Sequence, residues 1–175
     1  LYIMKSIGFI GCGNMAKPII RNVAEKNVFY KNDIYVYDID REKLVDFCEK
    51  TEVNVAESEK YIASHCDVVV LCIKPQVFPS LLPVICDELA ESKPLVVSIA
   101  AGKTTDYIAS FLSYDAPVAR IFPNLNAEVG QAVSAYTGNK FVNEEQLDVV
   151  KRICASYGEA EYLDESLFSV FGVLG

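Results

Sequence analysis

The stretch Ile7-Gly8-Phe9-Ile10-Gly11-Cys12-Gly13-Asn14-Met15-Ala16 joins a β-rich run to a helical pattern through a GxGxxA turn. Gly11 permits a tight turn, and Gly13 leaves the backbone without a Cβ where an anion would approach. Ala16 is small enough for the helix to pack closely on the strand. Backbone N–H groups and the positive end of the helix dipole then favour a phosphate. The sequence therefore predicts an anion-binding turn from Gly11 to Ala16.

A carboxylate at a suitable distance extends this interpretation to a dinucleotide. Asp38 ends the next β-rich run, 22 residues after Ala16. This is close to the spacing of about 20 residues at which an acidic residue holds a ribose 2′-hydroxyl. A glycine turn that serves packing alone is the alternative. The agreement of turn, carboxylate and strand–helix–strand pattern favours dinucleotide binding over it.

The residues after the second strand bear on the choice of nucleotide. Asp38 would repel a 2′-phosphate and accept a hydrogen bond from a 2′-hydroxyl, which favours NADH. Arg41 could instead turn inward and pair with the phosphate of NADPH. The expected cofactor is therefore NADH or NADPH, with NADH favoured.

Short β-like runs alternate with helical segments along the chain, which predicts parallel strands joined by crossover helices. The expected fold class is α/β, with a Rossmann-like, doubly wound and mostly parallel sheet. Strands are expected at residues 5–10, 33–38, 53–56, 67–73, 95–99, 117–122, 132–136 and 160–163. Helices are expected at about 14–26, 41–50, 77–89, 104–112 and 144–157, and around Ile62.

Composition indicates small-molecule chemistry. The chain has 175 residues, a net charge of −8 and 51% hydrophobic residues, as expected for a compact domain. A pI near 4.7 without a basic cluster argues against a nucleic-acid partner, whose phosphates need positive charge. No apolar run approaches the roughly 20 residues of a membrane helix, and no secretory signal begins the chain. We expect no membrane segment and a cytoplasmic location, with an organelle such as the mitochondrion left open.

The cysteine and histidine pattern argues against a metal centre. The six cysteines include no CxxC pair, and His65 is the single histidine that could complete a mixed zinc site. We therefore expect free thiols in a reducing compartment, with no structural disulfide and no metal. No nucleophile pattern accompanies His65, which is interpreted as a structural residue at a loop edge.

Three loops should meet at the ligand-binding edge, because a ligand of an open parallel sheet lies beyond the carboxyl ends of the strands. They cover residues 72–76, 98–102 and 120–124. Lys74 is either a solvated lysine or a cation facing the pyrophosphate and ribose. Ala100, Ala101 and Gly102 either allow tight packing or clear room for a flat nicotinamide ring.

Four motifs in this order resemble those of the pyrroline-5-carboxylate reductases. They are GCGNMA at 11–16, IKPQ at 73–76, SIAAG at 98–102 and RIFPN at 120–124. The resemblance covers nearly the whole chain and implies an oxidoreductase of proline biosynthesis, which reduces 1-pyrroline-5-carboxylate to L-proline with a hydride from NAD(P)H. In that family the glycine turn holds the pyrophosphate, and the IKP and AAG segments border the ribose and nicotinamide. The cofactor contacts that this implies are Gly11, Gly13, Asn14, Met15, Ala16, Ile73, Lys74, Pro75, Ala100 and Gly102.

The resemblance also implies a second, all-helical domain that forms a homodimer or larger homo-oligomer and supplies most of the substrate site. We expect the dinucleotide-binding domain at residues 1–164 and the beginning of the helical domain, cut off, at 165–175. These residues alone should then bind the cofactor but show no proline-forming turnover. An apolar stripe without a partner in the sheet domain is expected at Leu167, Phe168, Val170, Phe171, Val173 and Leu174.

Some positions depart from the family pattern. Many members carry an Asn-Arg pair after the second strand, matching NADPH, where this chain has Asp38 and Ile39. Where the family commonly reads MPNTPA, residues 122–127 read FPNLNA, and Asn124 is the candidate substrate contact in that loop. No residue reads as an indispensable acid or base, so the catalytic residues stay unassigned. The alternatives are a Rossmann dehydrogenase of the β-hydroxyacid or prephenate type and a non-catalytic nucleotide-binding regulator.

Overall fold

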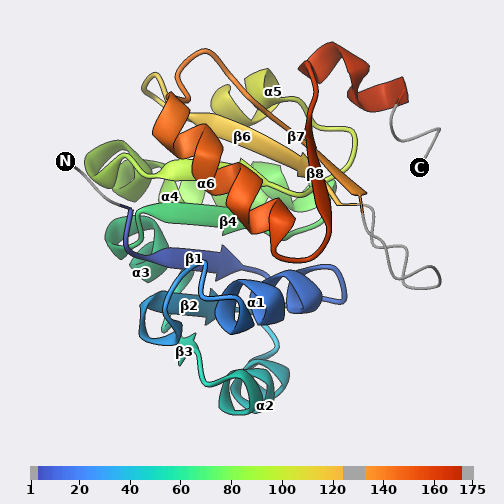
Figure 1. Cartoon of the computed structure of the whole chain (residues 1–175). Helices are drawn as coiled ribbons and strands as arrows, with labels where there is room; N and C mark the ends of the chain where they lie inside the picture. The colour runs from blue at the N-terminus through green and yellow to red at the C-terminus, as the bar shows by residue number, and fades with distance from the viewer. Residues whose placement is uncertain (1–3, 124–132, 171–175) are drawn as a thin grey trace.

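The computed structural model describes residues 4–123 and 133–170, and in them one sheet of eight strands has helices on both faces (Figure 1). The strands are β1 (Ile7–Ile10), β2 (Ile34–Tyr37), β3 (Asn54–Val55), β4 (Val68–Leu71), β5 (Leu95–Ser98), β6 (Val118–Phe122), β7 (Val133–Gly138) and β8 (Glu159–Tyr162). The helices are α1 (Ala16–Glu25), α2 (Arg41–Thr51), α3 (Glu59–His65), α4 (Phe78–Ser92), α5 (Thr105–Ala109) and α6 (Glu144–Ala155), with 3-10 turns η1 (Lys31–Asp33), η2 (Pro75–Val77) and η3 (Glu165–Leu167).

The strand order is β3-β2-β1-β4-β5-β6-β7-β8, so the chain winds outward from β1 in both directions. All neighbouring strands are parallel except β6 and β7, which are antiparallel. Ile10, the last residue of β1, pairs with Tyr37 of β2 and Leu71 of β4. The predicted Rossmann-like, doubly wound and mostly parallel α/β fold is confirmed. Its topological switch point, where ligands of such sheets bind, lies between β1 and β4.

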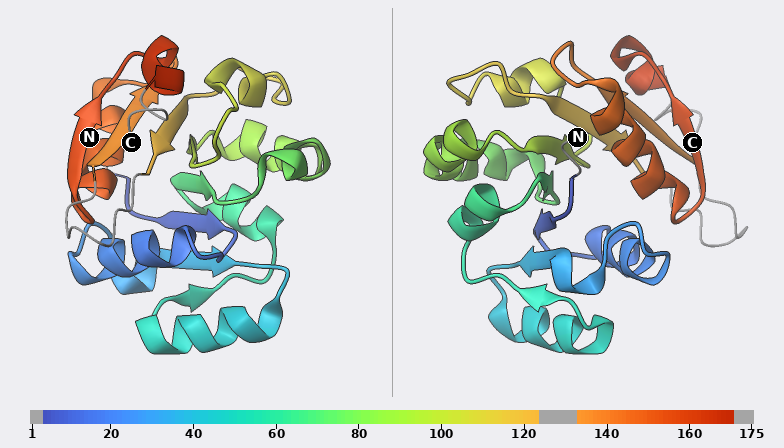
Figure 2. Two further views of the ribbon diagram at one scale, coloured as in Figure 1. Left: turned by 90° about the vertical axis from the view of Figure 1, so that its right-hand side faces the viewer. Right: turned by 60° about the vertical axis from the view of Figure 1, so that its left-hand side comes forward.

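Each face of the sheet is covered by its own helices and has its own hydrophobic core. Helices α1, α2 and α6 pack on one face, and α3, α4 and α5 pack on the other (Figure 2). Successive side chains of a strand point to opposite faces, so Val68 and Val70 belong to the first core and Val69 and Leu71 to the second. Strand β4 is therefore apolar at every position, as expected for a strand buried on both faces.

Local signals place the helix ends close to where the sequence predicts them. Thr104 caps α5, because its Oγ1 accepts the N–H of Tyr107 at 3.0 Å. A reciprocal capping box of Asn143 and Gln146 begins α6. Helix α4 continues through Pro83 and ends at Ser92, three residues beyond the predicted end.

The expectation that the apolar stripe near the C-terminus has no partner is wrong for Phe168. This ring is 4% exposed and lies 4.7 Å, centroid to Cζ, from the guanidinium of Arg120 on β6. Leu167 and Val170 are about half exposed, as expected. The remaining stripe positions, 171, 173 and 174, lie outside the described residues. The segment after β8 therefore packs on the sheet domain through its aromatic residue.

The structure shows the surroundings of the six cysteines and the histidine that the sequence singles out. All six cysteines are free thiols. His65 ends α3, with its ring stacked on that of Tyr61 at 4.2 Å and its Nδ1 2.9 Å from the Tyr61 carbonyl oxygen. In residues 4–123 and 133–170, no three His, Cys, Asp or Glu side chains are grouped to hold a metal ion. No helix of these ranges is long and apolar enough to cross a membrane.

Candidate functional site

The glycine turn after β1 is tight at one glycine and open at the other. Gly11 has a φ of 106°, and its N–H donates to the carbonyl oxygen of Tyr37 at 2.8 Å. A Cβ at this position would overlap the carbonyl oxygen of Cys72. A Cβ at Gly13 would meet nothing within 4 Å. Gly11 is therefore needed by the fold itself, whereas the space beside Gly13 is free for a ligand.

The start of α1 presents backbone donors toward that free space. Met15 occupies the N-cap position without a side-chain cap, and both Asn14 and Met15 are exposed. No acceptor contacts the N–H groups of Asn14 and Met15 in the part of the chain that the structure describes. Ala16 is 1% exposed and packs against the core, as predicted from its size. Open amides at the positive end of a ten-residue helix suit a phosphate group.

Asp38, directly after β2, is bound to the glycine turn. One carboxylate oxygen accepts the N–H of Cys12 at 2.7 Å, and the other accepts the N–H of Asp40 at 2.8 Å. Each oxygen keeps a second lone pair, so the carboxylate can still accept a hydroxyl. Next to it, Ile39 is 92% exposed. Arg41 is also exposed and begins α2.

The loop after β4 lies against the end of β1. The N–H of Cys72 donates to the carbonyl oxygen of Ile10 at 2.8 Å. Ile73 packs on the core beneath α3 and α4, whereas Lys74 is exposed. Pro75 then begins η2, and the Lys74 carbonyl oxygen accepts the N–H of Val77 at 2.9 Å. Lys74 is therefore exposed to solvent, two residues after Cys72, whose carbonyl oxygen adjoins Gly11.

The loop after β5 is held at its first residue. Ser98 is fully buried, and its Oγ accepts the N–H of Ala100 at 3.1 Å. Ala100 is buried, while Gly102 has a φ of 75° and free space where a Cβ would stand. The loop thus combines a fixed beginning with an open surface at Gly102.

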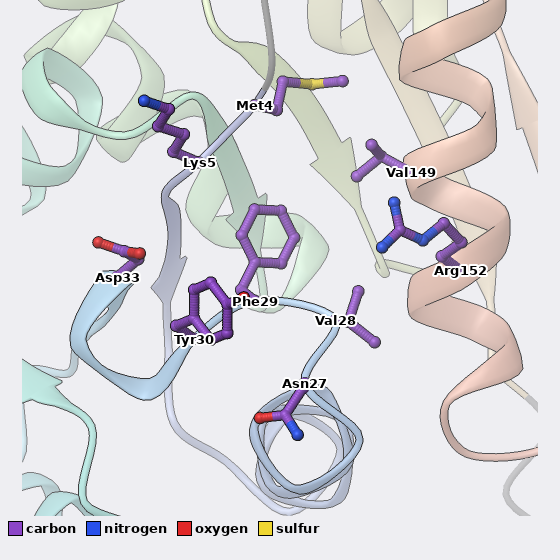
Figure 3. Close-up of a pocket in the computed structure, with 9 residues that line it drawn as sticks. All are labelled: Met4, Lys5, Asn27, Val28, Phe29, Tyr30, Asp33, Val149 and Arg152. Atoms are coloured by element: carbon purple, nitrogen blue, oxygen red, sulfur yellow. The ribbon is translucent and has the colours of Figure 1, made fainter.

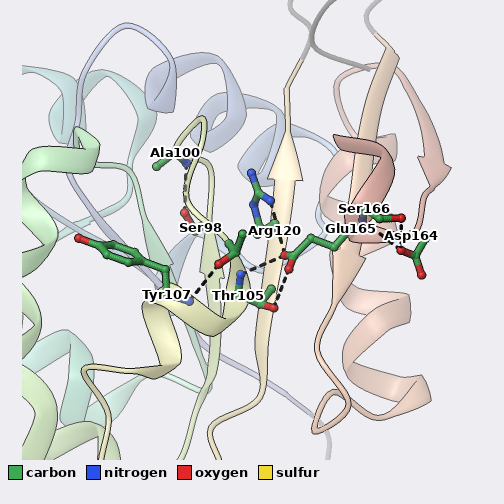
Figure 4. Close-up of polar contacts among 9 residues, drawn as sticks. Ser98, Ala100, Thr105, Tyr107, Arg120, Asp164, Glu165 and Ser166 are labelled. Carbon is green, nitrogen blue, oxygen red and sulfur yellow. Dashed lines mark hydrogen bonds and ion pairs between the residues drawn. The ribbon is translucent and has the colours of Figure 1, made fainter. Parts of the chain in front are cut away.

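A cavity of about 430 Å³ adjoins this loop at the carboxyl ends of β5 and β6. It is lined by Gly102, Thr104, Arg120, Phe122, Glu165, Phe168 and Ser169. Figure 4 shows the carboxylate of Glu165 between Thr105 and Arg120. Burial lowers the pKa of the Arg120 guanidinium from its ordinary value, and the charge of Glu165 opposes that shift. The ion pair is 3.5 Å long, and the Arg120 side chain is 7% exposed.

Sequence reasoning did not single out this cluster of Arg120, Thr105 and Glu165. The available signal is the position of Arg120 inside a predicted buried strand, because a buried arginine requires an acidic partner. Its partner could not be chosen from sequence, since many carboxylates are available. Asn124, the candidate substrate contact, lies outside the described residues.

Another cavity, of about 360 Å³, lies at the opposite edge of the sheet, beside the amino end of β1 (Figure 3). Helix α6 lines one side with Val149 and Arg152, and the chain from Asn27 to Asp33 lines the other. It includes none of the residues predicted to contact a cofactor. The carboxyl edge is therefore where the sequence-predicted site residues gather.

Burial keeps the thiol within the glycine turn protonated. Cys12 is 2% exposed, and desolvation raises its pKa from 9.0 to about 11, against the opposing charge of Lys17. Burial also raises the pKa of Cys72, at the end of β4. A protonated, buried thiol is a poor nucleophile, so these cysteines are packing residues of the turn.

The structure brings the predicted cofactor contacts to one edge, at the carboxyl ends of β1, β2, β4 and β5. These residues are Gly11, Gly13, Asn14, Met15, Ala16, Asp38, Ile73, Lys74, Pro75, Ala100 and Gly102. In Figure 1 the arrowheads of β1 and β2 point to this edge. The arrangement offers amide donors, the Asp38 carboxylate and the Lys74 ammonium group along this edge. Contact of each residue with a cofactor stays a prediction.

A family model described as NADP oxidoreductase, coenzyme F420-dependent, matches residues 6–102 of this sequence, which is more than half of the chain. The chain belongs to this family. The span matched by the NADP oxidoreductase family contains every residue predicted above to contact the cofactor. It runs from β1 to the loop after β5 and so includes the switch point of the sheet.

Beyond the family model, this chain is similar to pyrroline-5-carboxylate reductases. It is 35% identical to that of Escherichia coli over 172 residues, covering 98% of this chain and 64% of the relative. The Coxiella burnetii structure has a TM-score of 0.91 at 29% identity, and the Streptococcus pyogenes structure has 0.83 at 31%. These alignments cover 98% of this chain and 64% and 62% of the two structures. The predicted resemblance is confirmed, over a chain that spans less than two thirds of these relatives.

Proposed function

We propose that this protein reduces 1-pyrroline-5-carboxylate to L-proline with a hydride from NADH or NADPH. The observation that carries the proposal is the 35% identity to the Escherichia coli pyrroline-5-carboxylate reductase across 98% of the chain. Membership of an NADP oxidoreductase family supports the cofactor class. The open glycine turn at the switch point is the arrangement that such a cofactor requires.

The cofactor would lie along the carboxyl edge of the sheet. Its pyrophosphate would meet the amides from Gly13 to Ala16, and its ribose would meet Asp38. The loops at 73–75 and 100–102 would border the ribose and nicotinamide. The Asp38 carboxylate next to exposed Ile39 supports NADH as the preferred form, because a 2′-phosphate there would meet a negative charge.

The chemistry requires a hydride at the imine carbon and a proton at the imine nitrogen. When bound, the reduced nicotinamide supplies the hydride. The contribution of this chain is to bind and orient the dinucleotide and to close one side of the site against water. We assign no acid or base among its residues.

The domain organisation is part of the proposal. Residues 1–164 would form the dinucleotide-binding domain, and residues from 165 onward would begin a helical domain. That domain would form a homodimer or larger oligomer and complete the substrate site. Leu167 and Val170, both about half exposed, support such a partner surface. A cytoplasmic location is proposed with it.

The test compares the full-length protein with residues 1–175. Oxidation of NADH and NADPH is followed at 340 nm with and without 1-pyrroline-5-carboxylate, and light scattering reports the oligomeric state. We expect substrate-dependent oxidation by an oligomeric full-length protein and none by residues 1–175. Absence of turnover in the full-length protein would contradict the proposed reaction. Full turnover by residues 1–175 as a monomer would contradict the proposed division of the site.

A further inference from the structure

Glu165, in the segment that follows β8, is bound to the first residue of α5. Its Oε2 accepts the backbone N–H of Thr105 at 3.0 Å, and its Oε1 is 3.1 Å from the Thr105 hydroxyl, which donates to it. Both oxygens of one carboxylate are thus used by one residue that is 60 positions away in the sequence. Thr105 itself is 4% exposed. The contact is therefore specific and largely shielded from water.

Thr105 directly follows the loop that leaves β5. That loop is held at its beginning by Ser98, whose Oγ accepts the N–H of Ala100. Its end is held by Glu165 at Thr105 and by the cap that Thr104 makes to Tyr107. Gly102, between these anchors, has a φ of 75° and no neighbour where a Cβ would stand. The position of the loop thus depends on a residue from outside it.

Arg120 forms an ion pair with the Glu165 carboxylate. The guanidinium lies 3.5 Å from Oε2, and the Phe168 ring lies over it at 4.7 Å. Three residues of the segment after β8 also line the cavity that adjoins Gly102, namely Glu165, Phe168 and Ser169. The segment and the loop therefore share one polar junction and one cavity wall.

We infer that Glu165 is a positioning residue, which fixes the β5–α5 loop through Thr105 so that the loop can receive the nicotinamide end of the cofactor. This inference rests on the proposed function, which places the nicotinamide beside Ala100 and Gly102. The adenosine end would lie at the glycine turn and Asp38, which follow β1 and β2, whereas the junction is formed by α5, β6 and the segment after β8. Loss of Glu165 should consequently weaken binding of the nicotinamide half alone.

The experiment compares two ligands that share the adenosine diphosphate ribose part. Calorimetry measures NADH and ADP-ribose binding to the wild-type protein and to Glu165→Gln and Thr105→Val. The matched NADPH and 2′-phospho-ADP-ribose pair is used if NADPH binds more tightly. Thr105→Ser keeps the hydroxyl and the N–H, and Glu159→Gln removes a charge from an exposed position on β8, so both serve as controls. Thermal melting confirms that each variant is folded.

Glu165→Gln is expected to weaken NADH binding roughly five- to tenfold and ADP-ribose binding less than twofold, because charge-assisted hydrogen bonds are lost at one end of the site. Thr105→Val should weaken NADH in the same selective way, and the two controls should match the wild type. Equal weakening of both ligands, or no weakening by either variant, would overturn the positioning role while leaving the proposed function intact. A wild-type protein that binds neither dinucleotide would overturn both proposals.

Discussion

The carboxylate of Asp38 accepts the backbone N–H of Cys12 at 2.7 Å, which ties the end of β2 to the glycine turn after β1. The same carboxylate accepts the N–H of Asp40, so it also shapes the entry into α2. A residue predicted to meet the ribose is thus also a structural part of the phosphate-binding turn. Substitutions at Asp38 should separate these two roles.

Asp38→Asn should raise the ratio of NADPH to NADH affinity about fivefold. The amide oxygen can still accept the N–H of Cys12, whereas the negative charge that repels a 2′-phosphate is lost, and such a repulsion is worth about 1 kcal/mol for groups fully exposed to water. Asp38→Ala removes both acceptors and should weaken both dinucleotides. Calorimetric titration of each nucleotide measures the ratio. An unchanged ratio in the asparagine variant would assign nucleotide choice to another group, with Arg41 as the next candidate.

Glu165→Gln should destabilise the chain by roughly 2–3 kcal/mol, because Arg120 loses the negative charge that compensates its burial. Arg120→Met should cost less, since an apolar side chain fits beside Phe168 and Glu165 keeps its bonds to Thr105. Urea denaturation at pH 7 gives both free energies of unfolding. A larger loss for Arg120→Met than for Glu165→Gln would contradict this account of the junction.

Stability should fall as the pH rises above about 9. Burial raises the pKa of Cys12 to about 11 and the pKa values of Cys48, Cys66 and Cys154 to about 12, from an ordinary value of 9.0. Between pH 9 and 11 the unfolded chain loses thiol protons that the folded chain retains, so the free energy of unfolding decreases. The expected loss is about 1 kcal/mol per buried thiol at pH 10.

Urea denaturation at pH 7.5, 9 and 10 under reducing conditions measures this dependence. Cys48→Ala should show a smaller decrease, because one of the protonated thiols is absent. Equal stability at the three pH values would show that these thiols ionise alike in the folded and unfolded chain.

The carboxyl-edge site could be predicted from sequence because its signals are local. The glycine turn, the acidic residue after β2 and the loops after β4 and β5 each follow an apolar strand, and parallel pairing then brings their ends to one edge. Even the antiparallel β7 and the later α6 and β8 were expected as elements, since their hydrophobic patterns are periodic.

The junction of Glu165, Thr105 and Arg120 could not be predicted in the same way. Its members come from α5, β6 and the segment after β8, and no periodic pattern links them. The burial of Phe168 was missed for the same reason, because an aromatic residue after the last strand gives no sign of the guanidinium on which it stacks. The junction and the burial of Phe168 both depend on contacts between elements that are far apart in the sequence, and not on local propensity.

The central claim, that the glycine turn binds a nicotinamide dinucleotide, is tested most directly by calorimetric titration of NADH and NADPH into the wild-type protein and Gly13→Val. A valine at position 13 meets no protein atom at its Cβ and should leave the melting temperature nearly unchanged, unlike Gly11→Val, which would overlap the Cys72 carbonyl group. The account predicts that Gly13→Val is folded and loses dinucleotide binding by at least about a hundredfold, because its side chain fills the phosphate space. Equal affinity of the wild type and a folded Gly13→Val would contradict it.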